Sequence, residues 1–293
     1  MTDLDQAHKA ASFRAMHSGK RVLLLPNAWD VASACIIEEA GFAAIATTSA
    51  GIAFSLGYPD GQEIPKDEML AAVARIAKGV KVPVTADVES GYGNRPEDAA
   101  KTARAVMVAG AVGMNLEDAT GEASHPLAEL SLQLEKIQAV RETTTNLKVP
   151  LVLNARTDVY LLQIGDPARR YHETLRRLTA FRDAGADCVF VPGLRDPATI
   201  GRLIADLQCP VNILAVPGSA SVPELTKLGV ARISLGSGPM RASLGLLRRL
   251  AAELKTAGTY TAMEDAPLHA EMNTLMHASR NPKPGIENLK SAI

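Results

Sequence analysis

The sequence predicts an α/β protein folded as a (β/α)8 barrel, and three observations lead to that fold class. At 293 residues, the chain has the length of one such barrel. Helical stretches alternate with short, nearly continuous apolar runs, which is typical of parallel strands buried on both faces. The starts of these runs are of two kinds that recur along the chain. An open, doubly wound sheet is the second candidate, because a sequence does not show whether a sheet closes.

The first kind of start is the end of a helical stretch, then a glycine, then a run of apolar or β-branched residues. Glycine ends helices readily, since it adopts a positive φ without strain. A helix that stops and a strand that follows are therefore predicted at residues 38–49, 107–118, 182–193 and 226–237.

The second kind of start carries a proline, at residues 80–89, 147–157 and 207–217. Proline is tolerated at the beginning of a strand, where the sheet does not need its missing N–H. With an opening strand at residues 21–29 the count is eight strands, and the two kinds of start alternate from the second strand onward. No G-x-G-x-x-G sequence follows the first strand, which argues against a dinucleotide-binding sheet.

The chain continues beyond the eighth strand. Residues 239–258 are strongly helical in pattern, residues 260–281 predict at least one more helix, and residues 282–293 have no clear pattern. No linker or low-complexity segment divides the chain. We therefore expect a barrel domain at residues 1–258 and a C-terminal helical extension with its tail at residues 259–293.

Composition excludes several classes of function. The formal net charge is −1, with 31 basic and 32 acidic residues, so we expect neither a nucleic-acid surface nor a membrane-binding patch. No apolar run approaches the length of a membrane span, and the first residues lack a signal-peptide core. Cys35, Cys188 and Cys209 lie in apolar stretches without metal-ligand spacing, which predicts buried, reduced thiols in a cytoplasmic protein.

Charged side chains gather where successive strands end. Asp87 and Glu89 follow the third strand, Glu117 the fourth and Arg156 the fifth. Such ends meet at one mouth of a barrel, and strand alternation would place Asp87 and Glu89 on the same side. Three carboxylates this close repel one another unless a cation neutralises them, and Mg2+ suits oxygen ligands. The alternatives are solvated loop acids and, for Arg156, a salt bridge to Asp158 or Glu117 rather than a grip on a substrate carboxylate.

Other polar residues near the strand ends are further candidates. Ser49, Ala50 and Gly51 follow the second strand and could supply a hydroxyl and backbone N–H donors to an anion, or form only a turn. Asp60 lies in a Pro/Gly turn, where aspartate commonly serves the turn alone. His125, in the loop after the fourth strand, is a candidate acid or base.

Five segments resemble, in order and spacing, those of the isocitrate lyase/phosphoenolpyruvate mutase superfamily. They are NAWDVASA (27–34), TTSAGIAFSLGYPDG (47–61), ADVESGYGN (86–94), GMNLEDATG (113–121) and NARTDVY (154–160). The resemblance extends from about residue 20 to about residue 250. It implies a barrel whose last helix swaps between subunits, a dimer of dimers, a Mg2+ site with Mn2+ as an alternative, and small 2-oxo or 2-hydroxy carboxylic acids as substrates.

The resemblance also implies roles for individual acids. Asp87 looks like a metal ligand, and Glu89 and Glu117 look like ligands that bind the metal directly or through water. Glu89 stands where many members have Asp, and the additional methylene favours a water-bridged contact. Asp60 matches an acid near the metal that orients or activates the ligand.

The substrate side of the site is implied in the same way. Ser49, Ala50 and Gly51 resemble the segment that binds the carboxylate and ketone oxygen of the substrate. Trp29 looks like an adjacent wall, and Arg156 like the partner of the substrate's oxygens.

The loop after the fourth strand departs from the family pattern. It lacks the Lys-Lys-Cys-Gly-His-type stretch whose Cys acts as acid/base in isocitrate and methylisocitrate lyases, and also the Lys and Asn of phosphonomutase-like members. The first hypothesis is therefore a Mg2+-dependent carbon–carbon lyase or decarboxylase acting on a small 2-oxo or 2-hydroxy dicarboxylic acid through an enolate. Its acid/base is His125 or a metal-bound water. Alternatives are a phosphonopyruvate hydrolase or phosphonomutase, a catalytically weak 2-oxo acid binder, and a purely structural protein.

Overall fold

The computed structural model describes residues 3–19 and 21–280, and its strands form one parallel sheet. Every strand is short and nearly all strand residues are buried, as the apolar runs predict. The strands are β1 (Leu23–Leu25), β2 (Asn27–Ala28), β3 (Ile45–Thr47), β4 (Val84–Ala86), β5 (Gly113–Glu117), β6 (Val152–Arg156), β7 (Cys188–Phe190), β8 (Val211–Leu214) and β9 (Arg232–Ser234).

The sheet closes through its first strand. Its order is β1-β9-β8-β7-β6-β5-β4-β3-β2, and β1 and β2 are two halves of one strand separated by Pro26. One half pairs with β9 and the other with β3, so eight strand positions surround a nearly closed barrel. The predicted (β/α)8 barrel is confirmed, and the open sheet is not what the chain forms.

The side chain of Asn27 bridges the seam between the two neighbours of this broken strand. Its Nδ2 donates to Thr47 O over 2.7 Å, at the end of β3. Its Oδ1 accepts from the backbone N–H groups of Leu235 and Gly236, at 2.8 and 2.9 Å, just beyond β9. One buried amide therefore joins the two strand ends that flank the break.

Helices surround the barrel and begin and end where the sequence indicates. The four glycines at the predicted helix stops, Gly41, Gly110, Gly185 and Gly229, all have positive φ. The helices are α1 (Asp3–Met16), α2 (Val31–Glu39), α3 (Ser49–Ser55), α4 (Lys66–Gly79), α5 (Pro96–Val108), α6 (Leu130–Asn146), α7 (Pro167–Asp183), α8 (Pro197–Leu207), α9 (Val222–Lys227), α10 (Gly238–Thr256) and α11 (His269–Arg280), with a 3-10 turn η1 (Thr261–Met263).

The first helix closes the barrel at the end where the strands begin. Phe13 is fully buried, and a side chain in place of the hydrogen of Gly113 would approach its ring to 2.8 Å. Arg14 donates to Leu151 O just before β6 and forms an ion pair with Asp187 just before β7. At the opposite end of the barrel, the loops that follow the strands carry the candidate site.

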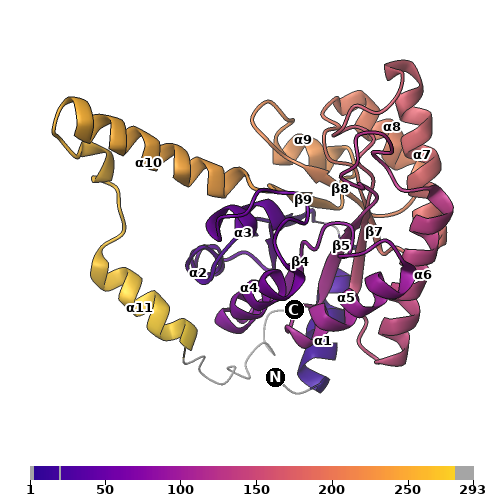
Figure 1. Cartoon of the computed structure of the whole chain (residues 1–293), viewed down its shortest axis with the longest axis horizontal. Helices are drawn as coiled ribbons and strands as arrows, with labels where there is room; N and C mark the ends of the chain where they lie inside the picture. The colour runs from indigo at the N-terminus through magenta and orange to yellow at the C-terminus, as the bar shows by residue number, and fades with distance from the viewer. Residues whose placement is uncertain (1–2, 20, 281–293) are drawn as a thin grey trace.

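The C-terminal helices depart from the compact body. In Figure 1, α10 extends away from the barrel, and only Met240 of its residues is buried. The turn η1 and α11 follow, and α11 returns to contact α2 and α4. None of the helices within residues 3–280 has the length and hydropathy that crossing a bilayer requires. Residues 282–293 lie outside the described part, and the division at residue 258 stays a prediction.

Candidate active site

Asp87 is held by three donors at the C-terminal end of β4. The backbone N–H and the hydroxyl of Ser49, at the start of α3, donate to Asp87 Oδ2 over 3.1 and 3.0 Å. Asn115 Nδ2, from β5, donates to Asp87 Oδ1 over 3.1 Å. The backbone N–H of Asp87 donates to Thr47 Oγ1 over 2.8 Å. Donors on both oxygens fix the rotation of this carboxylate.

Glu89 comes into the site by a different route from the one that strand alternation predicts. The strand ends at Ala86, and Glu89 has φ +53, a left-handed conformation that is uncommon for a side chain of this size. The inference that Asp87 and Glu89 share a side through alternation is therefore wrong, because the chain has already turned. Glu89 is nevertheless buried, and no partner within the described residues reaches its Oε1. Burial, then the charges of Asp87 and Asp60, raise the pKa of Glu89 to about 8.

Two distant side chains hold the loop that carries Glu89. Gln62 donates to Ser90 Oγ over 2.7 Å and accepts from the Tyr92 N–H over 2.8 Å. Lys136, from α6, donates from its buried ammonium to the carbonyls of Ser90 and Gly93 over 3.2 and 2.8 Å. These contacts account for the persistence of two left-handed residues, Glu89 and Tyr92, in one short loop.

Arg156 joins the acids that follow β5 and β6. Its Nε and Nη2 donate to the two oxygens of Asp158 over 2.5 and 2.8 Å, the bidentate geometry that suits arginine and carboxylate. Its Nη1 lies 2.7 Å from Glu117 Oε2, a charge contact without hydrogen-bond geometry. The alternative of a salt bridge to Asp158 or Glu117 is thus what the structure shows, with both partners engaged. Burial disfavours the guanidinium charge, but Glu117 and Asp158 outweigh it and raise the pKa of Arg156.

Neighbouring groups brace this cluster. Asp118 is fully buried and accepts from Thr157 Oγ1, the Asp158 N–H and Arg177 Nη1 over 2.7, 2.9 and 3.2 Å. Burial raises the pKa of Asp118 to about 6 although these donors lower it. Phe190, at the end of β7, lies against the Arg156 guanidinium, with 5.7 Å between ring centre and Cζ. The Phe190 ring thus places an apolar surface beside the guanidinium of this cluster.

The remaining predicted residues lie at different depths. Ser49, Ala50 and Gly51 are buried at the start of α3, where a Cβ on Gly51 would approach Thr48 Cγ2 to 2.5 Å. Asp60 is on an exposed loop, and desolvation followed by the charge of Asp87 raises the pKa of its carboxyl.

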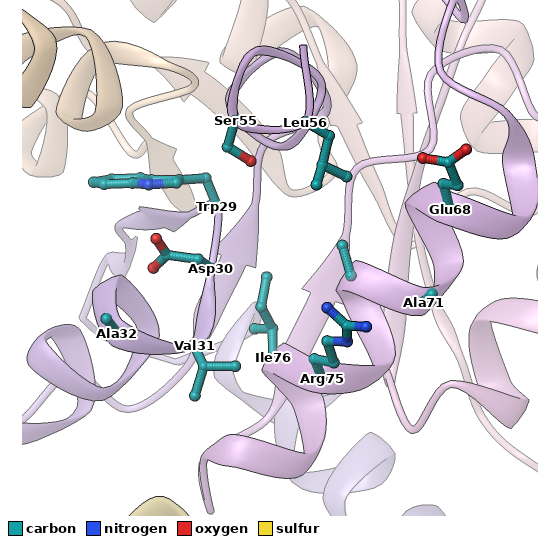
Figure 2. A pocket seen from close by; sticks show the side chains of 11 residues that line it. Trp29, Asp30, Val31, Ala32, Ser55, Leu56, Glu68, Ala71, Arg75 and Ile76 are labelled. Atoms are coloured by element: carbon teal, nitrogen blue, oxygen red, sulfur yellow. The ribbon is translucent and has the colours of Figure 1, made fainter. Parts of the chain in front are cut away.

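The other two predicted residues, His125 and Trp29, form no hydrogen bond or ion pair with these acids within the part of the chain that the structure describes. His125 is exposed, and its Nδ1 lies 3.1 Å from Ser124 Oγ in its own loop. Trp29 lines a surface pocket of about 460 Å3 among α2, α3 and α4. Figure 2 shows Trp29 beside Asp30 at one side of this pocket and Glu68 at the other. The roles of Trp29 and His125 at a substrate stay predictions.

The carboxylate oxygens at the strand ends are chemically suited to bind a hard divalent cation. Their present positions, however, do not form a coordination site. Among the described residues, no three His, Cys, Asp or Glu side chains are grouped closely enough to hold a metal ion as they stand. The partnerless Oε1 of Glu89 and the Oε2 of Glu117, which faces only an ion pair, are nonetheless oxygen ligands of the kind that Mg2+ prefers. The predicted set of Asp87, Glu89 and Glu117 therefore requires side-chain rotation to bind a metal.

Comparison with known proteins places this arrangement in a family. The phosphoenolpyruvate phosphomutase family model matches residues 13–255. The chain belongs to that family. It is 38% identical to an uncharacterized protein of Mycobacterium tuberculosis over 80% of this chain and 84% of that one. It is 32% identical to the 2,3-dimethylmalate lyase of Eubacterium barkeri over 62% of each chain.

Solved structures agree with this membership. A Burkholderia cenocepacia protein described as a lyase or mutase superposes with a TM-score of 0.87 at 39% identity, covering 92% of this chain and 96% of that one. The expected isocitrate lyase/phosphoenolpyruvate mutase superfamily is confirmed. The 2,3-dimethylmalate lyase is described as a member of that superfamily, and an oxaloacetate decarboxylase of Ectopseudomonas mendocina is 28% identical to this chain over 75% of each.

Proposed function

We propose that the protein is a Mg2+-dependent carbon–carbon lyase or decarboxylase acting on a small 2-oxo or 2-hydroxy dicarboxylic acid. The observation that supports it most is the juxtaposition, at the ends of β4, β5 and β6, of the Asp87 carboxylate and the Glu117–Arg156 pair, with Glu89 on the adjoining loop. Such a set can bind a hard cation and an acidic substrate side by side. The lyases and the decarboxylase among the relatives support the same class of reaction.

Each residue would have a distinct task. Asp87, Glu89 and Glu117 would hold Mg2+, or Mn2+ in its place. When bound, the cation would supply Lewis-acid stabilisation of the negative charge that develops as the carbon–carbon bond breaks. Asp158 fixes the plane of the Arg156 guanidinium by its bidentate contact, so that Nη1 faces the site. If Glu117 turns toward the cation, Arg156 Nη1 becomes free to donate to a substrate oxygen.

The proton donor or acceptor would come from a loop. His125 is exposed on the loop after β5 and would have to move with that loop to reach a substrate. A water molecule in the site is the alternative. Asp60, on the facing loop, would orient the ligand from the open side. Ala50, Gly51 and Trp29 would line the substrate on the α3 side.

A screen that couples binding to products tests the proposal. Thermal shifts with Mg2+ would be measured for oxaloacetate, 2-oxoglutarate, phosphonopyruvate and branched malates, and each ligand that binds would be analysed for products. We expect a dicarboxylate that is cleaved or loses CO2, with turnover abolished by EDTA and by Asp87→Ala. Asp196→Ala, which removes the exposed acid that caps α8, is the matched control and should retain turnover. Unchanged turnover in Asp87→Ala would contradict the metal assignment.

The same screen separates the alternatives. Phosphorus–carbon chemistry is supported by the family model, and phosphate released from phosphonopyruvate would identify it. Mg2+-dependent binding of 2-oxo acids without any product would identify a catalytically weak binder.

The proposal includes an assembly of several subunits in the cytoplasm. The exposed leucines of α10, among them Leu244, Leu247 and Leu254, would be covered by another copy through a swapped helix, giving a dimer of dimers. The free thiols of Cys35, Cys188 and Cys209 are consistent with a reducing compartment.

A further inference from the structure

Arg232 is a charged side chain buried inside the barrel. It lies on β9, is 1% exposed and is among the largest fully buried side chains of the protein. Within the described residues, its Nε and Nη1 have no hydrogen-bond partner and no carboxylate forms an ion pair with it. An arginine that is dehydrated in this way costs free energy, so its retention calls for a reason beyond packing.

The titratable groups that act on Arg232 come from several elements. Burial lowers the pKa of Arg232 to about 10, whereas Cys188 of β7 and Asp87 at the end of β4 oppose that decrease. His17, just beyond α1, has its own pKa lowered to about 4, chiefly by burial and then by Arg232, so its ring is neutral near pH 7. The guanidinium therefore keeps its charge at neutral pH, and the carboxyl group that acts on it is that of Asp87.

A single amide connects the arginine to that carboxylate. Arg232 Nη2 donates to Asn115 Oδ1 over 3.5 Å, and Asn115 Nδ2 donates to Asp87 Oδ1 over 3.1 Å. Asn154 Nδ2 donates to the same Asn115 oxygen over 2.8 Å, from the position directly opposite on β6. Because two donors occupy the oxygen of Asn115, its NH2 group must face Asp87.

We propose that Arg232 is a positioning residue that acts through Asn115 to hold the Asp87 carboxylate in the orientation that binds the divalent cation. The inference rests on the metal site of the proposed function. Hydrogen bonds in a chain polarise one another where water is excluded, so the buried charge strengthens the donor that Asn115 presents. Partners of this kind behind a metal ligand typically change metal affinity by roughly 10- to 100-fold.

A double-mutant cycle on Mn2+ binding tests the proposal without any substrate. Free Mn2+ would be measured by electron paramagnetic resonance for the native chain, Arg232→Met, Asn115→Leu and the double variant. We expect each single variant to bind Mn2+ about 10-fold more weakly. The double variant should bind Mn2+ no more weakly than the single variant with the lower affinity, because the two residues act on Asp87 in series.

Two further variants separate positioning from general destabilisation. Arg141→Met removes a half-buried arginine, one that pairs with Asp187 at the opposite end of the strands, and should bind Mn2+ as the native chain does. Arg232→Lys keeps a charge and should recover part of the affinity. If Arg232→Met does not fold, as judged by circular dichroism, Asn115→Leu and Arg232→Lys carry the comparison with the native chain.

The outcomes are distinct. If folded Arg232 variants bind Mn2+ with the native affinity, the positioning role of Arg232 is overturned, but the metal site of the proposed function is not. Losses that multiply in the double variant overturn the connection through Asn115. A native chain that binds no Mn2+ overturns the metal site of the proposed function and this inference with it.

Discussion

The hydroxyl of Ser49 donates to Asp87 Oδ2 over 3.0 Å, and the backbone N–H of Ser49 donates to the same oxygen. The sequence predicts separate tasks for these residues, with Ser49 at the substrate and Asp87 at the metal. The contact joins the first turn of α3 to the end of β4. A change in the orientation of either side chain is therefore transmitted directly to the other.

Removal of the Ser49 hydroxyl tests this connection. Because the hydroxyl donates to a charged, buried acceptor, Ser49→Ala should lower the free energy of unfolding by about 2 kcal/mol. The backbone donor remains, so Asp87 should keep its place but turn more freely, and Mn2+ affinity should fall by up to about 10-fold. Denaturant unfolding and Mn2+ titration would measure both effects. Ser55→Ala, on the same helix, removes a hydroxyl that donates to the backbone oxygen of Ile52, and equal effects in both variants would refute the connection.

Loss of the Arg156 charge should be costly to the fold. In Arg156→Met, Glu117 and Asp158 remain buried without their partner, and the free energy of unfolding should fall by roughly 3 kcal/mol or more. Urea denaturation measures the change. Arg176→Met breaks an exposed pair with Glu173 and should change stability by less than about 1 kcal/mol. Similar values for the two variants would mean that the Arg156 contacts are solvated.

Stability should depend on His17 in mildly acidic solution. The pKa of His17 is lowered from 6.5 to about 4 by burial and by Arg232, so the folded protein binds this proton less readily than the unfolded chain. The stabilisation is present above pH 6.5 and is lost as the pH falls toward 4, by roughly 3 kcal/mol in total.

The variant His17→Gln isolates this contribution. Glutamine does not titrate but can still donate to Phe13 O, which lies 2.9 Å from His17 Nδ1. In His17→Gln, the unfolding free energy should depend less steeply on pH between 6.5 and 4. The decrease in slope should correspond to the uptake of up to one proton on unfolding. An unchanged slope in His17→Gln would contradict the prediction.

The assembly should depend on the apolar residues of α10. Leu247 is 58% exposed and Leu254 is 50% exposed, so charges there should disfavour association while leaving the barrel folded. The double variant Leu247→Glu/Leu254→Glu should have a smaller mass in solution than the native chain, as measured by light scattering after gel filtration. Lys255→Glu changes an exposed charge on the same helix and should keep the native mass. A native chain that is already monomeric would end the assembly proposal.

The fold was predictable because its signals are local. From the second strand onward, each strand start carries its own glycine or proline, so the eight strands can be counted without knowledge of their partners. The course of α10 was not predictable in this way. Its exposed leucines would pack against a surface that is not part of α10, and no local sequence pattern identifies that surface.

The site was predictable only in part, for the same physical reason. The identities of Asp87, Glu117 and Arg156 follow from their places at strand ends. Asn115 lies two residues before Glu117, so alternation along β5 could have revealed it as a residue facing the same side. Gln62 and Lys136 reach the Glu89 loop from distant segments, and only the tertiary structure brings them there.

The broken first strand has a consequence for how the barrel opens. At the break, three hydrogen bonds to one side chain, Asn27, take over part of the closure that main-chain pairing provides elsewhere. A side chain can rotate out of such contacts without disturbing the strands on either side, whereas a main-chain ladder must separate as a unit. Amide hydrogens at Leu235 and Gly236 should therefore exchange with solvent through local fluctuation, well before those of the central strands. The loop after β9 leads directly into α10, so this less firmly closed part of the barrel lies at the base of the extended helix.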